Sequence, residues 1–197
     1  RPHCFCYCIR LANDNPVIIG KKLLITGKGR CNITNSADIE DMIGQYPRNA
    51  KFLYSALYTF TNDDIIRIIE ENGVKTKVER GGRVFPVTDK SQDVVKALKK
   101  YALKPNVSLV HDTVKSLIIS GGAVKGVKTS KTSITADRVI ICTGGKSYPR
   151  TGSTGDGYKF AKQAGHTIIE PKASLIPVLT EEKFVKDIMG LSLRNIK

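Results

Sequence analysis

The segment VIICTGGKSYPRTGSTGDGYKFAKQAG, Val139 to Gly165, carries six glycines behind a short apolar run. Val139 to Cys142 is apolar at every position, which favours a strand covered on both faces in a parallel sheet. Ligands of open α/β sheets bind beyond the carboxyl ends of the strands, where Thr143, Gly144 and Gly145 follow here. Because glycine has no Cβ, these residues predict either a ligand-binding turn or a tight turn that binds nothing.

The second half of the segment predicts a short helix that ends at Gly165. It begins within Thr154, Gly155, Asp156 and Gly157, and its first N–H groups have no partner inside the helix. Asp156 fits two roles, as a cap of this helix or as an acceptor of hydrogen bonds from the hydroxyls of a sugar or polyol.

Two glycine motifs fall short of nucleotide-binding signatures. Gly145-Lys146-Ser147 matches the end of a P-loop, but Ile140 stands where the first glycine is required and Pro149 interrupts the helix that should follow. Gly27 to Asn32 is a near miss to G-x-G-x-x-G, with asparagine in the last place. We therefore do not favour a nucleoside triphosphatase.

Upstream, the polar loop Thr26 to Ser36 follows a short apolar stretch and offers a compact set of donors and acceptors. Cys31 lies within it without a C-x-x-C partner, so a buried structural cysteine is a simpler interpretation than a redox thiol. His111 and His166 have no neighbouring carboxylate cluster, and no metal site is predicted.

Between these segments the periodicity indicates alternating helices and strands, and the fold class is α/β with a β-meander crossover. The expected helices are 49–60, 63–72 (capped by Asn62) and 91–103, and the expected strands are the hairpin 74–87, then 107–112, 113–120, 123–130 and finally 139–142.

Composition bounds the function. The 197 residues carry a formal charge of +14, which allows nucleic acid, an acidic membrane or a phosphate-rich cofactor as partner. The lysines are scattered, tryptophan is absent and aromatics make up 7%, so we expect no specific nucleic-acid partner. No apolar stretch approaches the roughly 20 residues of a membrane span, and no membrane partner is expected.

The cysteine pattern indicates a reducing cytoplasm, because five cysteines are an odd count. Cys4, Cys6 and Cys8 alternate, which is not the C-x2-4-C spacing of a zinc site. Residues 1–19 are too soon interrupted by polar residues for a signal peptide and are left as an atypical, unassigned segment.

Three blocks together resemble one family. GKKLLITGKGRCNITNS (20–36), ERGGRVFPVTDKSQDVVKAL (79–98) and VIICTGGKSYPRTGSTGDGYKFAKQAGH (139–166) are similar to the BaiN/YhiN-type NAD(P)/FAD-dependent oxidoreductases, also known as aminoacetone oxidase-like flavoproteins. The resemblance implies an FAD-binding Rossmann-like, two-dinucleotide-binding-domain fold with a β-meander, incomplete at both ends. It divides the chain into a partial FAD-binding domain at 20–170 and the start of an inserted β-rich domain at 171–197.

The resemblance also implies where the cofactor lies. The backbone of Val114 would meet the adenine, and Thr143, Gly144 and Gly145 would form the strand-end motif near FAD. The polar groups near the flavin or its ribityl chain would be Arg30, Cys31 and Asn32 together with Thr154, Gly155, Asp156 and Gly157. The family's G-x-G-x-x-G loop has no counterpart, because residues 1–19 contain no glycine.

The expected function is an FAD-dependent oxidoreductase at the level of the family, in which the flavin exchanges hydride with NAD(P)H or a small organic substrate. The alternative is a catalytically inactive remnant whose basic surface binds polyanions weakly. No catalytic residue is assigned, and the sequence does not identify the substrate, the choice between NADH and NADPH, or the oligomeric state.

Overall fold

The computed structural model describes residues 6–10, 19–147, 149, 152–173, 179–188 and 190–191. The chain forms two compact units, Arg1–Thr167 and Ile168–Lys197, and each is described by itself. In chain order the first unit contains β1 (Cys6–Arg10), α1 (Lys21–Ile25), η1 (Thr26–Gly29), β2 (Thr34–Asn35), α2 (Ile39–Gly44), η2 (Ala50–Leu53), α3 (Tyr54–Thr59), α4 (Asn62–Glu71), β3 (Thr76–Glu79), β4 (Arg83–Pro86), α5 (Ser91–Ala102), β5 (Val107–His111), β6 (Val114–Ser120), β7 (Ala123–Thr129), β8 (Ser133–Thr135) and α6 (Asp156–Gln163).

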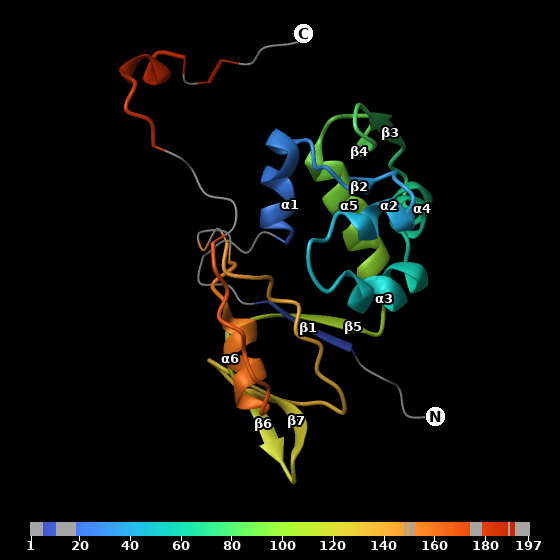
Figure 1. Ribbon diagram of the computed structural model, residues 1–197. Helices are drawn as coiled ribbons and strands as arrows, with labels where there is room; N and C mark the ends of the chain where they lie inside the picture. Colours follow the sequence, from blue (N-terminus) through green and yellow to red (C-terminus); the bar gives the residue numbers. More distant parts are fainter. Residues whose placement is uncertain are drawn as a thin grey trace. The chain divides into compact units, whose positions relative to one another are not determined.

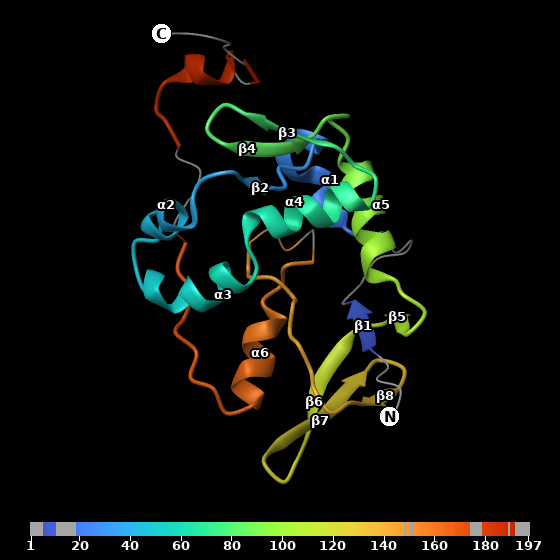
Figure 2. The same ribbon diagram turned by 90° about the vertical axis from the view of Figure 1, so that its right-hand side faces the viewer.

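Helices α4 and α5 pack together beside a three-stranded sheet with the order β2-β4-β3 (Figure 2). The predicted hairpin is confirmed, because β3 and β4 pair antiparallel. Buried Cys31, Ile69 and Val94 form the core between the helices and the polar loop. Helix α4 begins one residue earlier than predicted, since Thr61 is the cap and forms a capping box with Asp64.

The meander β6-β7-β8 is antiparallel and carries α6 on one face (Figure 1). Phe160 of α6 is buried against Leu117 and Val127, which joins the helix to the sheet. The side chain of Gln163 extends the contact, because its amide accepts from the backbone N–H of Leu117 (2.9 Å) and donates to the carbonyl of the same residue (3.0 Å). The meander therefore fixes the position of α6.

The amino-terminal segment, which the sequence analysis left unassigned, contains a strand that forms a parallel pair with a later strand. Strand β1 pairs with β5 in register from Cys6 opposite Val107 to Arg10 opposite His111. Residues 1–5, including Cys4, and residues 11–18 lie outside the described part of the chain. The alternating cysteines Cys6 and Cys8 thus belong to a β-strand.

The predicted buried strand at Val139–Cys142 is wrong. Within the described residues this segment has no β-pairing, and the side chains of Ile140 and Ile141 are 85% and 40% exposed. The run of β-branched residues favours an extended backbone, but a strand also requires a neighbour to pair its N–H and C=O groups. In the described residues the parallel sheet consists of β1 and β5, and Val139–Cys142 does not join it.

The second unit contains η4 (Lys183–Lys186) and no strand within its described residues 168–173, 179–188 and 190–191. The β-rich character expected for 171–197, like the division at 170, stays a prediction. Across the described ranges, every helix is too short or too polar to cross a membrane.

Candidate functional site: the glycine-rich turn and the start of α6

The turn after Ile141 and the start of α6 lie against each other through bare backbone. The N–H of Gly155 donates to the carbonyl of Gly145 (3.2 Å). A Cβ added to Gly157 would lie 2.7 Å from Oγ1 of Thr143, closer than real Cβ contacts come. The turn at Thr143–Gly145 and the helix start at Thr154–Gly157 therefore lie together, and their binding of a ligand stays a prediction.

Thr143 presents an unused polar atom at this contact. Its Oγ1 is buried and has no hydrogen-bond partner among the described residues. A buried hydroxyl without a partner costs free energy, so such groups in native proteins commonly have a bound water or ligand as partner.

Helix α6 begins without a side-chain cap. Its N-cap residue is Gly155, so the backbone N–H groups of the first turn have no capping side chain to which to donate. Asp156 is the first helical residue, and its carboxylate accepts instead from the Thr154 hydroxyl (2.5 Å) and pairs with Lys159 (3.0 Å). Both contacts lower the pKa of Asp156, with the bond from Thr154 as the largest cause, so the carboxylate stays ionised and acts as an acceptor.

A cavity of about 330 Å³ lies between α6 and the start of the meander. It brings Val114 together with Thr154 and Asp156, three residues that the resemblance placed along the cofactor. The other lining residues are Thr113, Lys115, Lys159 and Phe160. Thr143, Gly144 and Gly145 do not line this cavity, and neither do Arg30, Cys31 and Asn32.

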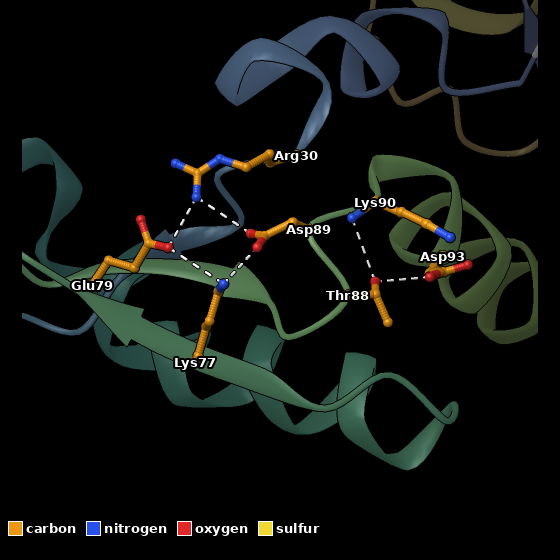
Figure 3. Close-up of polar contacts among 7 residues, drawn as sticks. All are labelled: Arg30, Lys77, Glu79, Thr88, Asp89, Lys90 and Asp93. Atoms are coloured by element: carbon orange, nitrogen blue, oxygen red, sulfur yellow. Dashed lines mark hydrogen bonds and ion pairs between the residues drawn. The ribbon is translucent and has the colours of Figure 1, made fainter.

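Arg30 is held by two carboxylates and an aromatic ring. Figure 3 shows its Nη1 atom between Glu79 (2.9 Å) and Asp89 (3.3 Å), with Lys77 bridging the same two acids at 3.5 and 2.7 Å. The guanidinium also lies 4.1 Å from the centre of the Phe85 ring. We call Arg30, Lys77, Glu79 and Asp89 the charge cluster. It gives Arg30 a structural role that the sequence did not predict, and a contact of Arg30 with a flavin stays a prediction.

The two residues after Arg30 belong to the core of the loop. Cys31 is 1% exposed and packs with Ile69 and Val94, and burial raises the pKa of its thiol. This placement fits the structural cysteine expected from the missing C-x-x-C partner. With its amide nitrogen turned to the sheet, Asn32 donates to the carbonyls of Val84 (3.2 Å) and Thr34 (3.0 Å). Cys31 thus packs the loop against α4 and α5 and Asn32 joins it to β4, while their contact with a cofactor stays a prediction.

The charge cluster yields a pH prediction for Arg30→Gln. The pKa values of Glu79 and Asp89 are lowered, chiefly by their bonds from Arg30 and Lys77. Their stabilising contribution is therefore complete above the unfolded pKa of about 4 and is lost as the pH falls through the lower folded pKa. Without Arg30 the folded pKa of Glu79 rises toward its unfolded value, so stability should fall less steeply from about pH 5 to pH 3.

Urea unfolding across this pH window measures the effect. Arg80→Gln is the matched control, because Arg80 is exposed and forms no ion pair within the described residues. Equal slopes of the unfolding free energy against pH in the wild type and in Arg30→Gln would show that the ion pairs of Arg30 do not stabilise the fold in solution.

Two further residues support the glycine-rich turn and were missed from the sequence. Ser153 is buried, and its Oγ accepts a bond from Nζ of Lys22 on α1 (2.9 Å). A Cβ on Gly144 would lie 3.2 Å from the same oxygen. The small polar residues between the glycines were a signal for such a contact, but the partner lies 131 residues away along the chain.

The residues present fit one end of an extended cofactor rich in hydroxyl and phosphate groups. The unpaired Thr143 hydroxyl, the uncapped amino end of α6 and the ionised Asp156 offer polar atoms to it, and Gly157 lets the turn and α6 approach closely. Such a turn before a helix on an α/β scaffold is typical of the dinucleotide-binding proteins of the Rossmann class. Comparison of sequences specifies the family: over residues 10–193 the chain matches the HI0933-like protein Rossmann domain and belongs to that family.

Three curated relatives are similar over most of the chain. A Haemophilus influenzae protein named ribosomal RNA dihydrouridine synthase is 33% identical over 192 residues, 91% of this chain and 46% of its own length. A Clostridium scindens protein named 3-dehydro-bile acid delta(4,6)-reductase is 33% identical over 172 residues, 85% of this chain and 39% of its own. An Escherichia coli protein named ribosomal RNA dihydrouridine synthase is 30% identical over 189 residues, 91% and 44%. The chain spans less than half the length of each relative.

Proposed function

We propose that this chain forms part of the FAD site of a flavin-dependent oxidoreductase. The observation that carries the proposal is the buried, unpartnered hydroxyl of Thr143 at the uncapped start of α6, which Gly157 allows to approach this closely. Membership of a Rossmann-domain family and a relative named as a reductase support the same class of activity.

Each part of the site has a task in this proposal. The first N–H groups of α6 face a negatively charged or electron-rich group of the cofactor, and Asp156 accepts hydrogen bonds from its hydroxyls. Gly144 and Gly145 allow the backbone to approach, while the start of β6 at Val114 offers backbone atoms to the adenine. Bound FAD would supply hydride transfer between NAD(P)H and the substrate.

The names of the relatives suggest two candidate substrates, a small molecule and an RNA. The reductase name points to a small molecule, which agrees with the expectation from the sequence. The synthase names point to a uridine base within RNA, a partner that the composition did not lead us to expect but that the formal charge of +14 allows. Either substrate would be reduced by hydride from the same flavin.

Anaerobic reduction of the FAD-loaded chain tests the proposal. NADPH or NADH should bleach the visible absorbance of the flavin, and a uridine-containing RNA or an unsaturated steroid should then restore it. FAD that stays oxidised with both nicotinamides, or that never binds, would favour the alternative of an inactive chain that holds polyanions by charge alone. In that case binding to any polyanion would fall steeply with salt.

A further inference from the structure

A second cavity lies outside the candidate cofactor site. It is a groove of about 530 Å³ between the end of α4, the segment after β4 and one face of α5. Asp93, Lys96, Ala97 and Lys100 follow the i, i+3, i+4, i+7 spacing of a single helix face. We define the lysine groove by its lining residues Asn72, Gly73, Val74, Lys75, Val87, Thr88, Asp93, Lys96, Ala97 and Lys100.

The groove has an apolar floor and a positively charged rim. Val74 packs against the core, and Ala97 is buried. Lys75, Lys96 and Lys100 are exposed around this floor. An apolar floor with three exposed ammonium groups around it fits a ligand that combines a flat apolar part with repeated negative charge.

The acids nearby leave this positive charge largely uncompensated. Asp93 accepts a bond from the Thr88 hydroxyl (2.8 Å), as Figure 3 shows, and lies 3.9 Å from Lys96. Lys75 and Lys100 form no ion pair with any carboxylate in the described residues. The groove thus has a local excess of positive charge that a phosphate-bearing partner would neutralise.

We propose that the lysine groove docks single-stranded RNA, with its phosphates on Lys75 and Lys100 and a base over the apolar floor. This inference rests on the proposed function in its RNA form, and it assigns a docking surface apart from the flavin site. RNA is favoured over other anions because the proposed function in its RNA form brings such a strand to the chain, and its repeated phosphates match the separate ammonium groups of Lys75 and Lys100.

Anisotropy of a labelled, uridine-containing single-stranded RNA with the full chain tests the proposal. Lys75→Gln/Lys100→Gln should weaken binding roughly tenfold at low salt and reduce the slope of log K against log salt by about 1.4. Lys125→Gln/Lys128→Gln on β7 is the matched control, since it removes the same charge from exposed positions elsewhere and should change neither quantity.

Three outcomes would overturn the docking site: equal losses in the two double variants, no loss in either, or a loss confined to NADPH binding, which would make the groove a nucleotide site. All four lysines are exposed, so unfolding midpoints should stay unchanged and show that the fold is intact. FAD binding, measured on the same samples, reports separately on the proposed function. RNA docking without FAD uptake would contradict that function and leave the groove supported.

Discussion

Replacing Gly126 with alanine should destabilise the meander by about 3 kcal/mol or more. Gly126 has a φ of +146°, in the region that disfavours side chains, and it pairs with Thr135 across β7 and β8. An added Cβ would lie 2.1 Å from the carbonyl oxygen of Ile134 and 2.9 Å from Cα of Thr135. Both are backbone atoms, so relief requires the two strands to separate.

Urea unfolding compares this variant with Gly122→Ala at the β6–β7 turn. Gly122 also has a positive φ of +73°, but no atom lies within 4 Å of an added Cβ. Its replacement should cost only the backbone strain, about 1 kcal/mol. If both alanines destabilise the chain equally, the close approach of β8 to Gly126 does not exist in solution.

Replacing Gly157 with valine should weaken FAD binding at least roughly tenfold, which corresponds to about 1.4 kcal/mol. The Cβ of the new side chain would lie 2.7 Å from Oγ1 of Thr143 and 3.4 Å from Cγ2 of Ile141, so the unpartnered hydroxyl would have to move away from the start of α6. Flavin fluorescence titration measures the dissociation constant.

Gly44→Val is the control for this variant. Gly44 is also a helical glycine, at the end of α2, and nothing lies within 4 Å of its added Cβ. Its FAD affinity should equal that of the wild type. If Gly157→Val binds FAD with unchanged affinity and retains its helix content, the start of α6 is not part of the cofactor site.

Local signals predicted the parts of the fold that depend on neighbours in sequence. Gly81 and Gly82 between alternating residues identified the β3–β4 hairpin, and the periodicity of 91–103 identified α5. Strand β1 escaped detection because its partner, β5, begins about a hundred residues later, and parallel pairing leaves no turn signal between them.

The error at Val139–Cys142 has a related cause. An apolar run shows that a segment favours an extended conformation, but burial depends on strands and helices that arrive from elsewhere. Within the described residues no such neighbour pairs with it.

The candidate site was predictable in part. The sequence identified the glycine-rich turn and the helix start, and the structure adds the hydrogen bond from Gly155 to Gly145 that joins them. The restraint of Arg30 was not predictable, since Glu79 and Asp89 lie 49 and 59 residues further along the chain. The resemblance placed Val114 and Asp156 at different parts of one cofactor, whereas the structure brings both into a single cavity.

Backbone hydrogen exchange with and without FAD tests the central claim most directly, because the proposed site consists largely of main-chain groups. The account predicts slower exchange, on addition of FAD, in the peptides that contain Thr143–Gly145 and Thr154–Gly157, and unchanged exchange in α2 and α3. Protection that is absent from these two segments, or that appears only elsewhere in the chain, would contradict it.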